Sequence, residues 1–505
     1  MTRTTKPAIW RRRAAGALAG GLALSFLWAA NRIEPAVPFP PLSVAERVIR
    51  LAPGDLATFF IETLGRNALR LLAIGTIAGF LVLYALLPEL TTARGRPHPF
   101  FAGAIAAVIC GGGAFLGPVQ PRPAGVILAS IAVGSLYSVS AAWLIGAGET
   151  AEPDLTRRRA LVSIGTAIAG FVVGGEMLGR VARRLAGPNT DVAIRAPDEP
   201  AATPRRSSFP GVPGLSQEIT SASDHYVVDI DLLDPVVETD DWFLAVRGLV
   251  DTPLDLTFSD LQRRFALVEE YSVLTCISNP VGGDLLGSSS WTGVRLGEVL
   301  SATGVREESV DVVFRCADGY SDSLPIEAAF DPSVILAIAQ NREPLAQEHG
   351  FPCRVRSPAV YGMKNAKWVE AVEVVDRDYK GYWMERGWSD VAIVRTQSRI
   401  DVVSPELVAG RPAWVAGVAW AGDRAVSRVE ISVDGGRTWA QAMLHPPLSR
   451  LAWTRWAYRW TPPEPGRYRI LCRATDGKGR LQEAMDRPPH PSGASGYHEV
   501  DVGAV

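Results

Sequence analysis

Cysteine is scarce in this sequence, and the spacing of the few cysteines excludes several kinds of site. Five cysteines occur among 505 residues. None belongs to a CxxC or CxxCH motif, which argues against a zinc ribbon, a thioredoxin-like site and covalently attached c-type haem. The odd count leaves no complete disulfide framework. Cys110 falls in an apolar stretch, and we expect Cys316, Cys353 and Cys472 to be buried packing residues.

A large net charge is also missing. The 51 Lys and Arg residues nearly balance 53 Asp and Glu residues, so the formal net charge is −2. The sequence therefore lacks the basic surface of a nucleic-acid-binding protein, and we expect no nucleic-acid partner. The length exceeds that of one domain. Apolar residues are unevenly distributed, because the first third of the chain is nearly all apolar and the rest is patterned as a soluble protein.

The first third contains apolar stretches that are each near the length needed to cross a bilayer. They cover residues 14–30, 69–87, 100–117, 124–146 and 160–178. Buried helices of a soluble domain rarely follow one another in such a series. We therefore expect a membrane region of about five transmembrane helices, surrounded by the lipid bilayer, over residues 1–186. Glu176 lies near the end of the last stretch, and we expect its side chain to reach toward the interface.

Two segments of this region leave alternatives open. Residues 14–30 follow a basic start and could be the apolar part of a signal peptide. However, residues 28–31 (WAAN) form a poor cleavage site, which favours a retained helix. Residues 42–66 alternate apolar and charged side chains, which fits either an amphipathic helix in the membrane interface or a connecting loop.

The flanking charges mildly favour one orientation. With five spans, a cytoplasmic N-terminus places the C-terminal part outside, and the arginines at positions 11–13, 94, 96 and 157–159 support this arrangement. Arg180, Arg183 and Arg184 argue against it. Residues 156–161 (TRRRAL) are similar to a twin-arginine export signal, or are simply a positive-inside cluster. We expect a multi-pass protein of the cell membrane whose C-terminal part is extracytoplasmic.

One short stretch, residues 274–284 (LTCISNPVGGD), organises the rest of the chain. A strand-like run that ends at Thr275 delivers Cys276 to a loop rich in Ser, Asn, Pro and Gly. Such a loop allows the backbone to approach a ligand closely. Taken alone, a cysteine in this position is more often a small buried hydrophobic residue.

Cations gather further along the chain. His349 and Arg354 occur within HGFPCR, and Lys364 and Lys367 occur within YGMKNAKW. These cationic residues lie next to predicted strands and have few acidic residues near them in the sequence. This pattern indicates an anion held by side chains and backbone N–H groups. From charge alone, a solvated basic face is the alternative.

These three motifs, in this order and spacing, resemble the molybdopterin-binding domain of the sulfite oxidase superfamily over roughly residues 215–500. The resemblance implies a molybdopterin (molybdenum cofactor), with Cys276 as catalytic residue and as protein ligand to the metal. A thiolate suits a redox transition metal, and the cofactor carries the redox chemistry while the protein binds and orients it. Asp318 sits where the family places another cofactor contact.

The resemblance also assigns cofactor contacts to the cationic motifs. His349 and Arg354 would hold the pterin. Lys364, Asn365 and Lys367 would hold its phosphate end.

Composition divides the region after the membrane part. Residues 187–214 are rich in Pro, Ala, Ser and Arg, which predicts a linker. Residues 215–394 mix helix and strand patterns, which predicts an α+β molybdopterin-binding catalytic domain. In this domain we expect Ser259 to cap the start of a helix. His225 and Tyr226 match a region that lies near the metal in the family, although a surface histidine is the commoner outcome.

Residues 395–505 are patterned as short alternating strands separated by turn signals, notably residues 434–436 (DGG). The predicted strands cover residues 414–419, 426–433, 438–444, 453–461 and 468–475. This spacing predicts an immunoglobulin-like β-sandwich. It is similar to the C-terminal dimerisation domain of the family, which implies a possible homodimer. His490 and His498 lie in a Pro/Gly-rich tail, and we assign them no chemistry.

The predicted fold class is therefore multi-domain, with a helical transmembrane region, an α+β molybdopterin-binding domain and an immunoglobulin-like sandwich. The resemblance implies an outward-facing oxidoreductase that transfers an oxygen atom between water and a small-molecule substrate. The apolar stretches contain no histidine, since His98 lies in a loop between them. A bis-histidine haem in the membrane part is therefore not expected, and the electron partner would be another protein or a quinone.

The substrate and the direction of the reaction stay open. Sulfite-oxidising members place arginines just after the cysteine, whereas residues 277–280 (ISNP) follow Cys276 here, which favours a neutral or weakly charged substrate. A reductase for sulfoxide-like groups is the main alternative within the enzyme class. A non-catalytic, membrane-anchored scaffold that kept the fold is the alternative outside it, although a scaffold needs neither a thiol nor an anion site.

Overall fold

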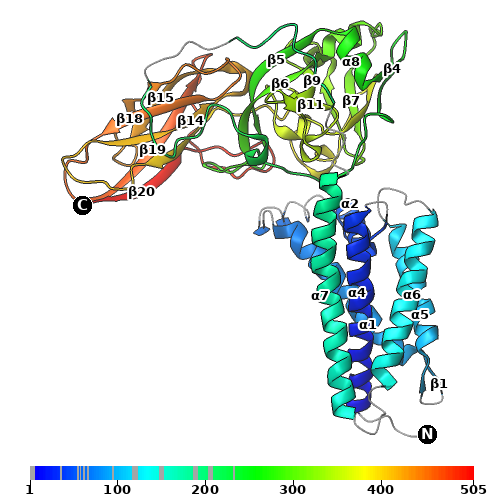
Figure 1. Cartoon of the computed structure of the whole chain (residues 1–505). Helices are drawn as coiled ribbons and strands as arrows, with labels where there is room; N and C mark the ends of the chain where they lie inside the picture. The colour runs from blue at the N-terminus through cyan, green and yellow to red at the C-terminus, as the bar shows by residue number, and fades with distance from the viewer. Residues whose placement is uncertain are drawn as a thin grey trace. The chain divides into compact units, whose positions relative to one another are not determined.

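The computed structural model describes residues 6–34, 37–53, 56, 59–60, 63–64, 67–93, 96–116, 123–146, 153–185, 192–202, 209–230 and 234–505. The chain separates into a helical unit, residues 1–187 with 230–233, and a sheet-rich unit that contains the remaining residues. The elements of both units are labelled in Figure 1.

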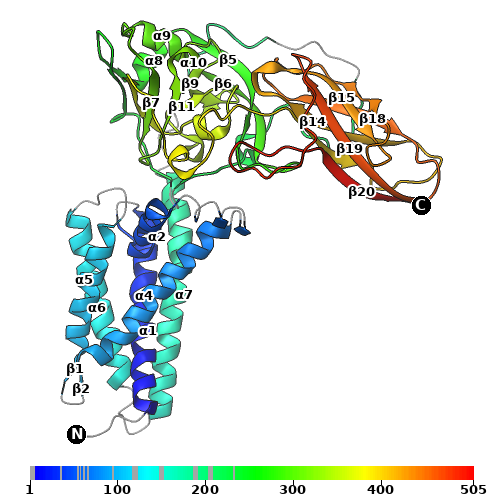
Figure 2. The same ribbon diagram turned by 180° about the vertical axis from the view of Figure 1, so that it is seen from behind.

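Long apolar helices make up the helical unit, seen from behind in Figure 2. They are joined by a short helix and comprise α1 (Lys6–Ile33), α2 (Pro40–Leu51), α4 (Asn67–Leu90), α5 (Pro99–Ala114), α6 (Pro123–Gly146) and α7 (Pro153–Leu185). Within the part of the chain that the structure describes, α1, α4, α6 and α7 are long and apolar enough to cross a membrane. Helix α5 is apolar but has only 16 residues. The prediction of about five such helices is therefore confirmed for four.

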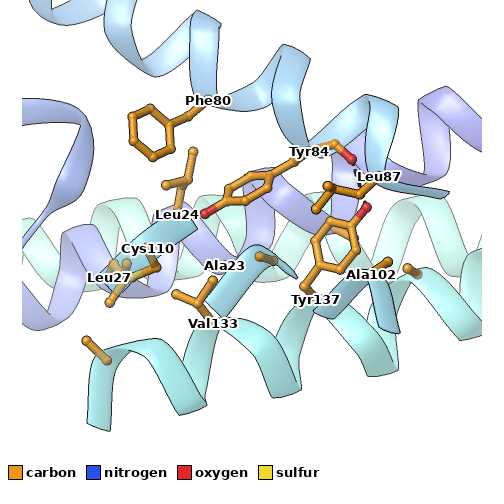
Figure 3. Packing of buried hydrophobic residues seen from close by; sticks show 14 of the residues in the cluster. Ala23, Leu24, Leu27, Phe80, Tyr84, Leu87, Ala102, Cys110, Val133 and Tyr137 are labelled. Atoms are coloured by element: carbon orange, nitrogen blue, oxygen red, sulfur yellow. Dashed lines mark hydrogen bonds between the residues drawn. The ribbon is translucent and has the colours of Figure 1, made fainter. Parts of the chain in front are cut away.

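A proline inside α4 leaves a backbone carbonyl that a neighbouring helix satisfies. Pro88 has no N–H, so the carbonyl of Tyr84, four residues earlier, loses its usual helical donor. The hydroxyl of Tyr137 on α6 donates to this carbonyl at 2.7 Å. Figure 3 shows both rings within the packed core between the helices. Such internal pairing is needed in a bilayer, where water is not available to the backbone.

Ion pairs lie near both ends of α1. Arg13 makes two hydrogen bonds to the carboxylate of Glu89 on α4, and Arg32 lies 2.8 Å from Glu176 on α7. Glu176, which we predicted to reach toward the interface, is thus paired with a neighbouring helix. The two arginines are separated by about 28 Å of helix at 1.5 Å per residue, close to the hydrocarbon thickness of a bilayer.

Some predictions for this region fall partly outside the described residues. The alternating segment 42–66 is helical up to Leu51, where α2 ends, and much of the remainder is not described. Of the arginines at 157–159, the side chains of Arg158 and Arg159 are described and exposed. In the predicted linker, residues 187–191 and 203–208 lie outside the described part.

The first half of the sheet-rich unit contains two five-stranded sheets with short helices between the strands. The first sheet has the order β10 (Glu343–Pro344), β9 (Ile335–Gln340), β6 (Leu286–Arg295) and β5 (Leu267–Thr275), with β11 (Arg354–Arg356) also paired to β9. The second has the order β4 (Leu254–Thr257), β3 (Phe243–Gly248), β12 (Val369–Val375), β7 (Asp311–Cys316) and β8 (Ser321–Pro325). The helices are α8 (Phe258–Arg264), α9 (Leu296–Ser301) and α10 (Ile326–Ala329).

The N-cap of α8 differs from the prediction. Thr257, not Ser259, accepts the N–H of Asp260, and the Asp260 carboxylate accepts the N–H of Thr257. This is a capping box, with an acidic residue three positions after the cap. The helix begins two residues earlier than expected because strand β4 runs directly into it.

The second half contains two four-stranded antiparallel sheets that share one apolar core. One sheet has the order β13 (Gln397–Val403), β14 (Ala413–Trp420), β18 (Thr454–Trp460) and β17 (Met443–Leu444). The other has the order β16 (Ala440–Gln441), β15 (Val426–Ser432), β19 (Gly466–Asp476) and β20 (His498–Ala504). Residues 438–444, predicted as one strand, instead supply β16 and β17, one to each sheet. The end of the Pro/Gly-rich tail, from His498 to Ala504, forms β20.

Buried residues confirm the predicted role of the remaining cysteines. Cys316, Cys353 and Cys472 are all buried and free of disulfides, and Cys472 lies in the core between the last two sheets.

Part of the predicted linker is ordered against the first sheet, since the N–H of Glu199 donates to the carbonyl of Leu267 at 3.1 Å.

Candidate functional site

Cys276 stands where β5 ends and the glycine-containing loop begins. Its N–H donates to the carbonyl of Leu285 at 2.9 Å, and the side-chain oxygen of Asn279 accepts the Leu285 N–H at 2.9 Å, so the loop is closed on itself. The Cys276 thiol is buried, with its sulfur 3.0 Å from the hydroxyl oxygen of Ser278. Burial raises the pKa of the thiol. A bound metal would reverse this effect, because a coordinating thiol is deprotonated outright.

Glycines allow this loop to pack tightly against the C-terminal strands. Gly282 has a φ of +76°, and a Cβ there would lie 2.3 Å from a ring carbon of His498. Only glycine fits such a position without displacing the ring. The guanidinium of Arg399 donates to the carbonyl of Gly283 at 2.8 Å. His498, to which we assigned no chemistry, therefore packs against the loop that carries Cys276.

Two arginines on β11 lie over one tryptophan ring. Arg354 and Arg356 are two residues apart on a strand, so their side chains leave it on the same side. Their Cζ atoms lie 5.2 and 4.7 Å from the centroid of the Trp291 ring on β6. Guanidinium groups stack favourably on aromatic faces. Both arginines are buried, with 4% and 1% of their surface exposed.

Neutral groups accept the N–H groups of these arginines. Arg354 donates to the carbonyls of His349 at 2.9 Å and Asn365 at 3.1 Å. Arg356 donates to the side-chain oxygen of Asn365 and to the hydroxyl of Ser272 at 2.8 Å. Among the described residues, the Nε of each arginine has no partner and neither arginine forms an ion pair. Burial lowers the pKa of Arg354 to about 10 and that of Arg356 to about 9.

Two histidines adjoin the same ring system. The His225 ring lies 5.8 Å from Trp291 and 5.6 Å from His349, measured between centroids. His349 Nε2 lies 2.7 Å from the carbonyl oxygen of Ala222. Burial lowers the pKa of His225 to about 3 and that of His349 to about 4, and the charge of Arg354 acts in the same direction on both. Both imidazoles are therefore neutral near pH 7.

Tyr226 connects this cluster to Cys276. A Cβ built on Gly362 would lie 2.5 Å from the Tyr226 hydroxyl oxygen and 3.7 Å from the Cα of Cys276. The Tyr226 hydroxyl and the backbone of Cys276 therefore both lie next to Gly362. The ring of Tyr226 stacks on His225 with centroids 5.4 Å apart. Burial raises the pKa of Tyr226 well above its ordinary value, so its hydroxyl stays protonated.

The two lysines predicted to hold a phosphate are paired with carboxylates. Lys364 Nζ lies 3.1 Å from Asp322 and 3.3 Å from Asp390. Lys367 forms an ion pair with Asp229. Both lysines are therefore neutralised within the protein, in contrast to the arginines of β11.

Asp318 lies with the Lys364 group. It is buried and accepts the N–H of Tyr320 at 2.9 Å. The hydroxyl oxygen of Tyr320 lies 2.9 Å from the carboxylate of Asp322 and 2.7 Å from the carbonyl oxygen of Met363, and its single proton serves one of these two acceptors at a time.

The structure thus sorts the predicted residues into separate sets. The set that we name the arginine cluster consists of His225, Tyr226, Trp291, His349, Arg354 and Arg356, and it lies beside Cys276. Asn365 bonds to both arginines, whereas Asp318, Lys364 and Lys367 are held by their own partners. Sequence reasoning missed Arg356 and Trp291. The alternation Arg-Val-Arg at 354–356 could have revealed the second arginine, because it puts two cations on one side of a buried strand.

These residues fit a bound anion held next to a thiolate. The two buried guanidinium groups of the arginine cluster form no ion pair among the described residues, and each has an unused Nε–H donor. The charges of Asp229 and Glu270 act on Arg354 and Arg356, respectively, only from a distance. A buried charge is costly unless it is compensated. An anionic group that also carries a thiolate-binding metal would supply that compensation, and a pterin dithiolene with a phosphate is such a group.

Two family models cover most of the sheet-rich unit. Residues 232–383 match the model described as the oxidoreductase molybdopterin binding domain. Residues 389–487 match the Mo-co oxidoreductase dimerisation domain.

Curated relatives match the same region. The mitochondrial sulfite oxidase of Rattus norvegicus is 33% identical over 237 residues, which cover 39% of this chain and 42% of that protein. The uncharacterized oxidoreductase YuiH of Bacillus subtilis (strain 168) is 34% identical over 147 residues, which cover 29% of this chain and 72% of that protein. The chain thus spans less than half the length of the rat relative.

A solved structure has a similar fold. The sulfane dehydrogenase SoxCD of Paracoccus pantotrophus gives a TM-score of 0.51 at 22% identity, over 60% of this chain and 88% of that chain. At this identity the likeness concerns the fold alone.

Proposed function

Because the chain belongs to the sulfite oxidase superfamily of molybdopterin-dependent oxidoreductases, we propose that it transfers an oxygen atom between water and a small substrate at a molybdenum centre ligated by Cys276. The protein is an oxidoreductase and its cofactor is molybdopterin, as the sequence predicted. The observation that carries the proposed site is the buried Cys276 thiol in the same region as two buried arginines that form no ion pair among the described residues.

The bound cofactor supplies the two-electron redox chemistry. The residues of this chain bind and orient it. We assign the pterin to His349 and Arg354, with Asn365 fixing both arginines of β11 through its carbonyl and side-chain oxygens. His349 is neutral, so it contributes hydrogen bonding rather than charge.

Lys364, Asn365 and Lys367 are proposed as contacts at the phosphate end of the cofactor, and Asp318 as another cofactor contact. Lys364 and Lys367 already have carboxylate partners. A phosphate there would share each lysine with its carboxylate, or displace it. The role of these residues is therefore a weaker electrostatic one than that of the arginine cluster.

We extend the proposal to the setting of the enzyme. The four long apolar helices anchor it in the cell membrane as a multi-pass protein, with the sheet-rich unit on the extracytoplasmic side. Residues 395–505 form an immunoglobulin-like sandwich through which two copies pair. The substrate is small and neutral or weakly charged, since ISNP follows Cys276, and single electrons pass to another protein or a quinone.

Metal and pterin analysis of the purified full-length protein tests the proposal. We expect close to one molybdenum and one pterin per chain when the host supplies the cofactor, and loss of both in Cys276→Ala combined with Arg354→Met. A folded wild-type protein without either would contradict the enzyme assignment and favour a scaffold that kept the fold.

A further inference from the structure

Arg356 is a buried cation for which the resemblance to the family gives no role. It is the last residue of the short strand β11, which pairs with β9, and only 1% of its surface is exposed. Its N–H groups go to the side-chain oxygen of Asn365, the hydroxyl of Ser272 and the carbonyl of Val273, all of them neutral acceptors. Its Nε is unpartnered in the described part of the chain.

Other buried cations of the sheet-rich unit are treated differently. Lys364 has Asp322 at 3.1 Å, and Arg424 has Asp476 at 2.9 Å. A protein that needed only to fill the space at position 356 would lose less free energy with an apolar side chain, because burying an unpaired charge is costly. The retained charge therefore points to an anion that is present in the functional state.

Burial decides how Arg356 can act on such an anion. Because only 1% of the surface of Arg356 is exposed, its charge would act on a bound anion through its electric field rather than by direct contact. Arg356 donates to the carbonyl of Val273 on β5 at 3.1 Å, three residues before Cys276, which is about 10 Å along the strand. In a low-dielectric interior the field of such a charge is weakly screened.

The second arginine strengthens this argument. Arg354 stacks on the same Trp291 ring, and like charges placed side by side repel each other. Asn365 bridges the pair by accepting from both, which holds them in place despite the repulsion. The arrangement concentrates two positive charges beside the loop that carries Cys276.

We propose that Arg356 is a positioning residue whose fixed positive charge, held on Trp291 beside Arg354, stabilises the anionic cofactor with its Cys276 thiolate and raises the reduction potential of the bound metal. This inference rests on the proposed function. A cation favours the more reduced, more negative state of a nearby centre, and hydrogen bonds and buried charges near a metal tune its potential.

Three full-length variants test it: Arg356→Met, which keeps the volume but removes the charge, Arg356→Lys, which keeps the charge, and Arg315→Met as a matched control. Arg315 is a partly exposed arginine on β7 that pairs with Glu373. The readouts are molybdenum and pterin per chain, the midpoint potential of the metal from a redox titration followed by electron paramagnetic resonance, and the urea midpoint of the cofactor-free protein.

We expect Arg356→Met to lower the midpoint potential and to reduce cofactor content severalfold. Arg356→Lys should keep most of the wild-type potential, and the control should match wild type. The cofactor-free Arg356→Met protein should be at least as stable as cofactor-free wild type, because an uncompensated buried charge has been removed.

Three results would overturn the inference. They are a wild-type potential with full cofactor content in Arg356→Met, an equal shift in the Met and Lys variants, and a cofactor-free Arg356→Met protein that is unstable or fails to fold. Each would make Arg356 a packing residue. Folded wild-type protein that takes up no molybdenum from a host that supplies the cofactor would instead defeat the proposed function, so the two failures are distinguishable.

Discussion

The two halves of the sheet-rich unit bury arginine in opposite ways. In the region that matches the dimerisation domain, Arg424 pairs with Asp476 at 2.9 Å, and the same carboxylate also accepts from Arg480. In the region that matches the molybdopterin-binding domain, Arg354 and Arg356 have neutral acceptors only. A fold can satisfy its own charges, as the first region does. Where it leaves two of them uncompensated, the missing charge is expected to come from a ligand.

The first prediction, with the largest expected effect, compares serine substitutions at two buried cysteines, Cys276 and Cys472. Cys276→Ser should lower the turnover of the loaded enzyme by on the order of 10³-fold or more, because it removes a group on which the whole site depends. The stability of the fold should change little, since a serine hydroxyl at the end of β5 has the Ser278 hydroxyl, 3.0 Å from the present sulfur, as a hydrogen-bond partner. The measurement is substrate turnover together with urea unfolding.

Cys472→Ser is the control for this experiment. Cys472 is buried in the core between the last two sheets, so a hydroxyl there should lower stability by about 1–3 kcal/mol while the loaded protein keeps its turnover. Equal losses of turnover in both variants would contradict the assignment of Cys276 to the active site and of Cys472 to packing.

The second prediction breaks the paired arginine. Asp476→Ala should lower the free energy of unfolding by roughly 3 kcal/mol or more, because it leaves Arg424 buried without its partner. Asp476 is almost fully buried and also accepts the backbone N–H groups of Lys478 and Arg480. The measurement is urea unfolding of wild type and variant.

An exposed pair provides the matched control. Arg469 and Asp501 form an ion pair on the surface of the same sheet, with more than half of each side chain exposed. Asp501→Ala should therefore leave the unfolding midpoint nearly unchanged. A similar loss in both variants would show that burial does not decide the strength of these pairs.

The third prediction concerns acid sensitivity of the arginine cluster in cofactor-free protein. The pKa of His349 is lowered to about 4, whereas a free histidine titrates near 6.5. Between these values the unfolded chain binds a proton that the native protein does not, so stability falls as pH decreases from about 6.5 to about 4. The slope is about 1.4 kcal/mol per pH unit for one such group.

His349→Gln tests this sign directly. Glutamine keeps a hydrogen-bond donor for the carbonyl of Ala222 but does not titrate, so the loss of stability between pH 6.5 and 5 should be reduced by this amount. Urea unfolding followed by tryptophan fluorescence at several pH values gives the slope. An unchanged slope would mean that His349 is protonated in the native protein.

Sequence patterns predicted the elements better than the side-chain contacts. Hydrophobic runs located the long helices, and alternation located most strands of the last two sheets, because these patterns directly reflect which faces are buried. The strand at residues 438–444 was predicted as one element but is divided between two sheets. Nothing in the local pattern records that the chain changes sheets within it.

The candidate site shows the same limit. The motifs identified Cys276 and Arg354 by resemblance, but the acidic partners of Lys364 and Lys367 come from Asp322, Asp390 and Asp229, which are far away in sequence. The number of acidic residues near Lys364 and Lys367 in the sequence therefore did not predict that their charges are neutralised in the fold. Arg356 was overlooked because a charged residue in a buried strand has no local signature other than its spacing from Arg354.

The last and smallest expected effect is at the helix cap that the sequence placed two residues too late. Thr257 and Asp260 exchange hydrogen bonds at the start of α8, in the catalytic half of the unit but without any contact to Cys276 or the arginine cluster among the bonds described. Thr257→Ala should cost about 1 kcal/mol of stability, as loss of an N-cap usually does. Ser259→Ala, which removes the wrongly predicted cap, should cost much less. Both variants should retain wild-type cofactor content, since a polar interaction satisfied entirely within the fold contributes to stability alone. A fall in cofactor content in Thr257→Ala would contradict this expectation. It would show that a hydrogen bond paired within the fold also affects cofactor binding in this protein.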